Sequence, residues 1–151
     1  FGKEYYKDDL IFEGEYLDGK RFRGKEYNDK GRLIYEGDYL NGLKYNGIEY
    51  HINGNIRYKG DYMFEQRHGK GTEYYYYNSD IRFEGEYLNG KRHGKGKEYF
   101  YDKILKFEGE YEKGERCRKG KEYCKNDYYY LSYEGDYLHG KKKWNRKRIF
   151  L

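Results

Sequence analysis

The chain has 151 residues, of which 36% are hydrophobic and 39% are charged, and it contains no Val, Ala or Pro. Because 24 Tyr and 8 Phe supply most of the apolar surface, the composition excludes an ordinary aliphatic core but suits a thin sheet, in which Tyr buries its ring and keeps its hydroxyl near water. The net charge is +5, but residues 141–151 hold six bases and no acid, so residues 1–140 have a net charge of −1 and no general attraction for phosphates.

Residues 1–11 begin inside a repeating pattern. Gly2–Tyr5 matches a Gly-x-Glu-Tyr phrase that returns five times later in the chain, and it is predicted to form the second strand of a repeat whose first strand is absent. A terminal strand exposes unpaired N–H and C=O groups. We therefore expect further repeats upstream or a partner on this edge, such as a second copy of the chain.

From Phe12 onward, a pentad with the pattern aromatic-acidic-Gly-acidic-Tyr recurs at intervals of 23 to 26 residues, with Lys59 replacing the first acid in one copy. A fixed period of this length is typical of a repeat array, in which each unit packs mainly against its neighbours. The six pentads begin at Phe12, Tyr35, Tyr58, Phe83, Phe107 and Tyr133.

Two kinds of turn alternate between the predicted strands. One kind, such as Asn89-Gly90, is a strong hairpin signal because both central residues of a type I′ turn need positive φ. The other kind, such as residues 78–80, is longer and more variable. The sequence therefore predicts an all-β fold: an elongated, single-layer, twisted antiparallel meander of about twelve strands. Residues 1–140 form the repeat array in this interpretation, and residues 141–151 form a basic tail or capping strand.

Counting residues from the turns predicts how the strands pair. In the fourth unit a two-residue turn pairs Tyr87 with Arg92 and brings Phe83 opposite Gly96. The first two units are one residue shorter between these positions. A three-residue loop with glycine last would keep the same alignment there.

The pentads and the glycines that follow them resemble the MORN repeat family, and the resemblance covers nearly the whole chain. The first two units depart from the motif, since Phe22 and Tyr45 stand where one motif glycine belongs. The resemblance implies an array of β-hairpins and an association with scaffolding at membranes, the cytoskeleton and junctions. In the fourth unit every motif position matches, through Phe83, Gly85, Tyr87, Gly90, Gly94 and Gly96.

No combination of residues indicates catalysis or a cofactor. Acids such as Glu84 and Glu86 stand side by side in nearly every unit, whereas acid–base catalysis needs two carboxyls in different environments. His68 and His93 occupy equivalent positions of successive units, but two ligands leave a metal site incomplete. We therefore predict no enzymatic activity, no metal and no cofactor.

The repeated aromatic residues are the candidate interaction face, because aromatic side chains commonly anchor protein interfaces. They are Phe12, Tyr16, Tyr35, Tyr39, Tyr58, Tyr62, Phe83, Tyr87, Phe107, Tyr111, Tyr133 and Tyr137.

The basic tail is the other candidate. It is predicted either to protect the sheet edge, as lysines do, or to contact an anionic membrane with Trp144 as an apolar anchor. The residues of this second interpretation are Lys141, Lys142, Lys143, Trp144, Arg146, Lys147 and Arg148.

The leading hypothesis is a non-enzymatic scaffold that binds another protein, or a second copy through a sheet edge. The sequence shows no signal peptide and no long apolar run, which favours an intracellular, cytoplasmic protein. The resemblance implies that it is associated with the cytoskeleton or a membrane. Two alternatives remain: binding of anionic phospholipid, and, as the resemblance implies, the targeting part of a larger enzyme. Nucleic acid is not an expected partner, because no supporting fold accompanies the basic tail.

Overall fold

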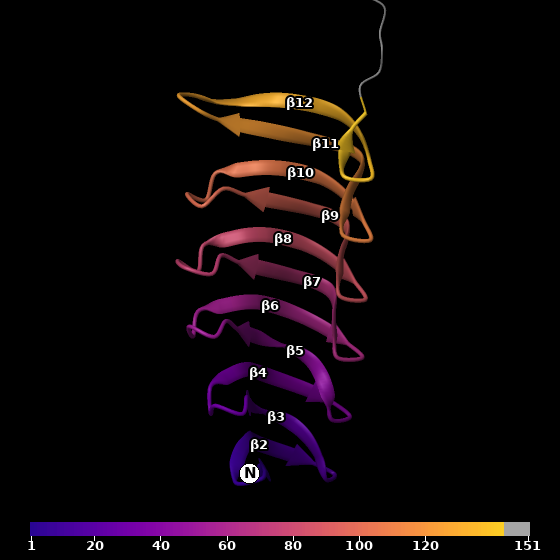
Figure 1. Ribbon diagram of the computed structural model, residues 1–151. Helices are drawn as coiled ribbons and strands as arrows, with labels where there is room; N and C mark the ends of the chain where they lie inside the picture. Colours follow the sequence, from indigo (N-terminus) through magenta and orange to yellow (C-terminus); the bar gives the residue numbers. More distant parts are fainter. Residues whose placement is uncertain (144–151) are drawn as a thin grey trace, which may run out of the picture.

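The computed structural model describes residues 1–143, which form one open antiparallel sheet of thirteen strands in sequence order. Figure 1 shows the strands stacked in a single layer, with the N-terminal hairpins at one end and β12 at the other. The predicted all-β meander is confirmed, with one strand more than expected because Lys141 and Lys142 pair with β12. The strands are β1 (Gly2–Tyr6), β2 (Asp9–Leu17), β3 (Lys20–Tyr27), β4 (Leu33–Leu40), β5 (Leu43–Tyr50), β6 (Ile56–Met63), β7 (Gln66–Tyr74), β8 (Ile81–Leu88), β9 (Lys91–Tyr99), β10 (Leu105–Glu112), β11 (Glu115–Lys125), β12 (Tyr129–Leu138) and β13 (Lys141–Lys142).

The tight turns all join the strands of one hairpin through two residues. In the fourth unit Asn89 and Gly90 have φ values of 49° and 79°, as a type I′ turn requires. The three-residue loop predicted for the shorter units is wrong, since Leu17 pairs with Lys20 across a two-residue turn. The difference in length between units must therefore be absorbed elsewhere.

It is absorbed by β-bulges inside the second strand of each hairpin. In the fourth unit Tyr87 pairs with Arg92 as predicted, but Phe83 lies opposite Glu98 and not opposite Gly96. The first unit has the same final alignment, with Phe12 opposite Glu26. The predicted register was wrong because a bulge places extra residues on one strand only, which counting from the turn cannot detect.

One glycine from each of β1 to β12 lies opposite a glycine of the neighbouring strand, which makes a continuous glycine ladder across the sheet. A Cβ at Gly96 would lie 2.5 Å from the Phe83 ring, and a Cβ at Gly37 would lie 2.3 Å from the Asn46 carbonyl oxygen. Neither position has room for a side chain. The ladder consists of Gly2, Gly14, Gly24, Gly37, Gly47, Gly60, Gly71, Gly85, Gly96, Gly109, Gly120 and Gly135.

The core lies on one side of the sheet, here called the aromatic face. It is the side to which side chains at the ladder positions would point if they were not glycine. The first aromatic ring of each unit packs edge-on against the last Tyr of the next unit's pentad. The ring centroids of Phe83 and Tyr111, for example, lie 5.2 Å apart at 84°. Such edge-to-face pairs are worth about 0.5–1.5 kcal/mol beyond their buried area. A single layer therefore gains its core by joining each unit to the next.

Candidate functional site

The twelve aromatic residues proposed as an interaction face lie inside this core. Phe12, Tyr58, Phe83 and Phe107 are 0% exposed, six more of the twelve are also buried, and Tyr16 and Tyr133 are partly buried and packed against them. We therefore correct the assignment of this row as a contact surface. The first ring of each pentad lies between ladder glycines and a cation, so a partner would have no access to the face of that ring.

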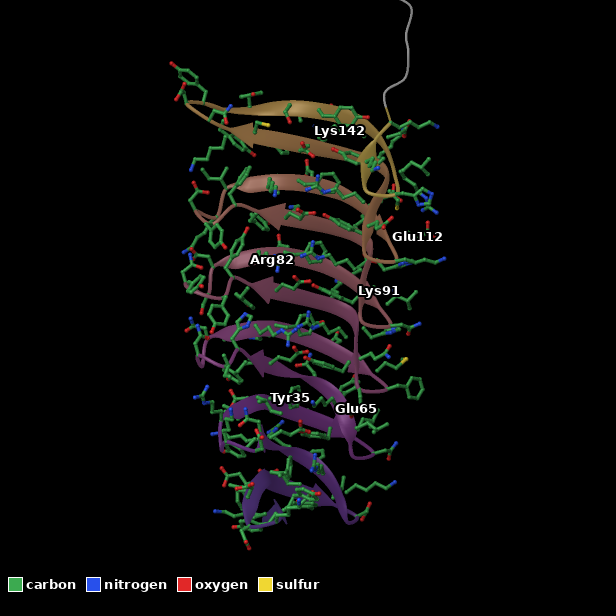
Figure 2. The ribbon with its side chains drawn as sticks, viewed as in Figure 1. Tyr35, Glu65, Arg82, Lys91, Glu112 and Lys142 are labelled. Atoms are coloured by element: carbon green, nitrogen blue, oxygen red, sulfur yellow. The ribbon has the colours of Figure 1, made fainter. Side chains whose placement is uncertain are left out.

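A repeated cap of one glutamate, one Tyr hydroxyl and one cation covers the rings. Figure 2 draws the side chains along the sheet. In the fourth unit Arg92 donates two hydrogen bonds to the Glu73 carboxylate, at 3.1 and 2.8 Å, and Tyr87 donates a third at 2.7 Å. The Arg92 guanidinium also lies 4.1 Å from the Phe83 ring centroid. Each capping charge is thus paired where it meets the core, and the caps over the rings form a neutralised network.

The pKa values of the capping carboxyls follow from this pairing. Burial by itself would raise the pKa of Glu73, but hydrogen bonds from Arg92 and Tyr87 outweigh it and hold that pKa below its ordinary value. At the N-terminal end a hydrogen bond from Arg21 lowers the pKa of Glu4 to about 2. The caps therefore stay ionised at neutral pH and act as structural ion pairs.

The opposite side of the sheet, here called the charged face, has two rows of side chains that flank the glycine ladder. Glu84 and Glu86 flank Gly85 on β8, and the next strand continues both rows with basic residues. Acidic and basic strands then alternate to β12. The row toward the longer loops is Thr72, Glu84, Lys97, Glu108, Lys121 and Glu134, and the row toward the tight turns is Lys70, Glu86, Lys95, Glu110, Lys119 and Asp136.

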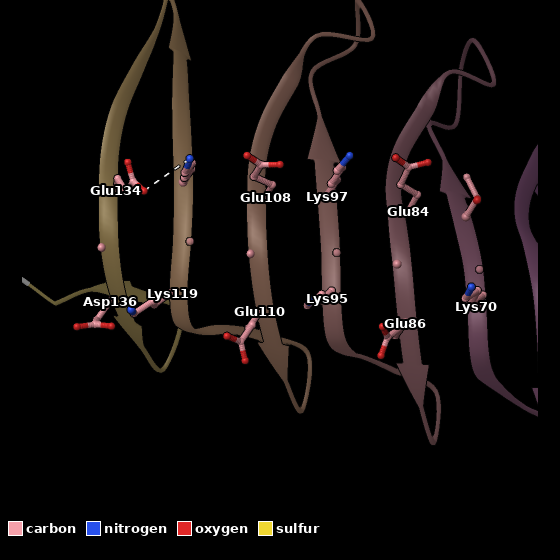
Figure 3. A pocket seen from close by; sticks show the side chains of 18 residues that line it. Lys70, Glu84, Glu86, Lys95, Lys97, Glu108, Glu110, Lys119, Glu134 and Asp136 are labelled. Carbon is pink, nitrogen blue, oxygen red and sulfur yellow. Dashed lines mark ion pairs between the residues drawn. The ribbon is translucent and has the colours of Figure 1, made fainter.

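Between these rows lies an open groove of about 880 Å³ that extends from β7 to β12. Figure 3 shows the labelled acids and lysines standing in two lines on either side of the ladder. The groove floor is the backbone of the ladder strands, because a side chain at any ladder position would point to the opposite, aromatic face. Tyr99 donates to the Glu84 carboxylate and Tyr123 donates to Glu108 at 3.2 Å, so these walls are held in place.

Several groove charges have no partner within the described chain. Lys121 makes an ion pair with Glu134 at 3.6 Å, whereas no ion pair involves Lys95, Lys97 or Lys119 among residues 1–143. The groove as a whole carries five lysines against six carboxylates. It can therefore bind groups of either sign, but it has no excess charge of one sign.

Sequence reasoning did not select these residues, although a signal was present. The triplets acid-Gly-acid and Lys-Gly-Lys occur on alternate strands. Because side chains alternate between the two faces of a strand, both residues beside each glycine point to the face opposite the one that a side chain at the glycine position would take. A second missed feature is a set of exposed apolar side chains in and beside the tight turns of the first three units. It comprises Leu17, Phe22, Leu40, Leu43, Tyr45, Met63 and Phe64.

The described part of the basic tail continues the sheet. Lys141 and Lys142 form β13, and Lys142 Nζ lies 2.7 Å from the Glu122 carboxylate, where earlier units place their capping cation. Lys143 donates its backbone N–H to the Asp136 carbonyl at 2.7 Å. The other residues proposed to contact a membrane, Trp144, Arg146, Lys147 and Arg148, lie outside the described residues.

A model of the MORN repeat matches residues 58–76, 83–103 and 107–127. The chain contains three consecutive MORN repeats. MORN repeats are in general interaction or membrane-binding modules and are typically not enzymes. The three matched segments are the third, fourth and fifth units of the MORN array, which are the units that place their bulges beside the groove. None of the curated proteins matches the chain.

Two further properties of the described MORN array bear on its function. Residues 1–143 contain no group of three His, Cys, Asp or Glu side chains arranged to hold a metal ion. The same residues form no helix that is long and apolar enough to cross a membrane.

Proposed function

We propose that the chain is a non-enzymatic interaction module that binds a segment of another protein along the glycine-floored groove. The observation that carries this proposal is the combination of a bare backbone floor with two walls of alternating charge from β7 to β12. A row without side chains lets a ligand backbone approach closely. The walls then supply hydrogen bonds and charges that select among segments.

The spacing of the walls defines the partner's chemistry. Neighbouring strands lie about 4.8 Å apart, so side chains of like sign recur about every 9.6 Å along each wall. The floor N–H and C=O groups already pair within the sheet, which leaves recognition to side chains. We infer that the partner segment carries both acidic and basic groups and lies across the strands.

Charge balance favours a protein over a phosphate surface. A nucleic acid or an anionic membrane presents one sign of charge and needs an excess of bases. The groove has six carboxylates against five lysines, so acidic strands would repel such a surface at every second step. A protein segment with mixed charge meets no such penalty.

Reversal of two groove lysines tests the proposal. Lys97→Glu with Lys121→Glu should abolish recovery of the partner that the unmodified chain retains in affinity purification from its native source. Lys25→Glu is the matched control, because Lys25 lies in the same row on β3, outside the groove. Equal recovery by the double variant would exclude the groove as the binding site.

Vesicle sedimentation separates this function from lipid binding. A chain that ends at Lys143 keeps the Lys142–Glu122 cap, and we expect it not to sediment with phosphatidylserine or phosphoinositide vesicles at physiological salt. The full chain is the direct comparison, since it differs only in the last eight residues. Salt-resistant binding by the shortened chain would replace the protein-binding proposal with a lipid-binding one.

A further inference from the structure

A second cavity, of about 400 Å³, lies on the aromatic face near the longer loops that follow β5, β7 and β9. Its wall includes the cations Arg82 and Lys106, together with His51 and several tyrosines. It shares no residue with the groove, which lies on the charged face. A pocket of this size accommodates a small organic molecule.

The two cations reach the cavity through a bulge that every unit repeats. In each unit, the residue directly before the first aromatic residue of the pentad has no partner on the preceding strand. On β8 this residue is Arg82, between Ile81 and Phe83. Such a bulge changes the direction in which the side chain of the extra residue points. Only the third to fifth units place a cation there. The bulge residues, in chain order, are Ile11, Ile34, Arg57, Arg82, Lys106 and Ser132.

The charge of the cavity is unbalanced. Arg92 and Glu98 also line it, but Arg92 pairs with Glu73 at 2.8 Å, and Glu98 pairs with Arg116 at 2.8 Å. No ion pair or hydrogen bond of the side chains of Arg82 and Lys106 is found within residues 1–143. Two positive charges therefore remain available to a ligand.

The remaining wall supplies an aromatic surface and an unsatisfied polar atom. The rings of Tyr75 and Tyr101 stack with their centroids 3.8 Å apart, and Tyr75 donates its hydroxyl to the Tyr99 carbonyl at 2.7 Å. Tyr101 remains 59% exposed, so it can take a further flat group. The Nε2 atom of His51 is buried without a hydrogen-bond partner, a state that proteins usually avoid.

We propose that this cavity binds a small aromatic phosphate ester, with its phosphate between Arg82 and Lys106 and its ring against Tyr101. A phosphate monoester carries about −1.5 to −2 charges at neutral pH, which matches two unpaired cations. Arginine and lysine are the usual side-chain partners of phosphate. A carboxylate would neutralise only one of them.

Titration calorimetry of the full chain tests the site with three probes: phenyl phosphate, inorganic phosphate and phenol. We expect phenyl phosphate to bind, inorganic phosphate to bind at least tenfold more weakly, and phenol to give no signal. Tyr101→Leu should weaken phenyl phosphate but leave inorganic phosphate unchanged. Absence of phenyl phosphate binding would overturn the proposal.

The equivalent bulge residues of successive units provide matched variants. Arg82→Gln and Lys106→Gln should each weaken phenyl phosphate about tenfold or more, whereas Arg57→Gln, at the same bulge one unit earlier and outside the cavity, should not. An equal loss in all three variants would show a non-specific charge effect and exclude the site. A phosphotyrosine peptide compared with phenyl phosphate then identifies the source: tighter binding of the peptide indicates a partner's side chain, and equal or weaker binding indicates a free ligand.

Discussion

The first two hairpin units, residues 12–50, and the third to fifth units, residues 58–125, share one core but differ on the charged face. In each unit of the first region, the bulge in the second strand of the hairpin contains one extra residue. This residue is Phe22 in the first unit, with its side chain 41% exposed, and Tyr45 in the second, with its side chain 55% exposed. In the later region the bulge is longer and includes a left-handed residue, such as Gly94 with φ 61°. The groove accompanies the longer bulge.

The bulge also changes how the acids beside it are held. In the first region Asp38 pairs with Arg23 of the preceding hairpin at 2.6 Å. In the third unit the Asp61 carboxylate accepts a hydrogen bond from the Lys70 backbone N–H at 3.1 Å, within its own hairpin. The comparison teaches that the core motif specifies the array, whereas the bulge residues specify its outer surface.

The largest expected effect is on the shared core, and it should be equal in both regions. Gly37→Val and Gly85→Val place a side chain where a Cβ alone would lie 2.3 or 2.7 Å from a carbonyl oxygen. Each should cost about 3 kcal/mol of unfolding free energy or more, measured by denaturant titration. Glu84→Gln is the control, with a cost below about 1 kcal/mol. A large loss in one region only would contradict a common core.

Acid should act next most strongly, and again on both regions. The pKa of Glu4 on β1 is lowered by Arg21 and Tyr16 of the first region, and the pKa values of Glu73 and Glu98 in the second region are likewise lowered by Arg and Tyr partners. A lowered folded-state pKa stabilises the fold above the unfolded-state pKa, near 4.5, and this contribution is lost as pH falls.

We therefore expect the thermal midpoint to fall steadily from about pH 4.5 toward pH 2. Hydrogen exchange followed over the same range should show protection lost together in both regions. Loss confined to one region, or a midpoint that rises on acidification, would show that the caps do not stabilise the array as described.

The smallest expected effect on stability comes from converting one kind of bulge into the other. Deletion of Gly94 gives the fourth unit the bulge length of the first, and the strand pairing of Phe83 with Glu98 should survive at a cost of about 1 kcal/mol. Partner recovery through the groove should nevertheless fall. Deletion of Gly31, a left-handed loop residue with open space around it, is the control. Unchanged recovery of the partner by the chain without Gly94 would show that binding in the groove does not depend on the longer bulge.

The sequence alone predicted the fold because its signals are local. Turns such as Asn89-Gly90 need positive φ at both residues, and strand alternation fixes which side chains share a face. The candidate site was harder to predict. Tyr and Phe at every pentad indicated an exposed aromatic surface, but only packing between units shows that Phe83 lies under Arg92 and against Tyr111.

The sequence by itself determined the repeat period, the turns and the all-β meander. The tertiary structure alone decided the strand register, which side chains are buried and where the groove lies. The physical reason is that a bulge adds residues to one strand without a distinctive local sequence, since Phe22 and the pair Gly94 and Lys95 serve the same position. Their pairing is fixed by the aromatic rings and glutamates of neighbouring strands, which are distant in sequence.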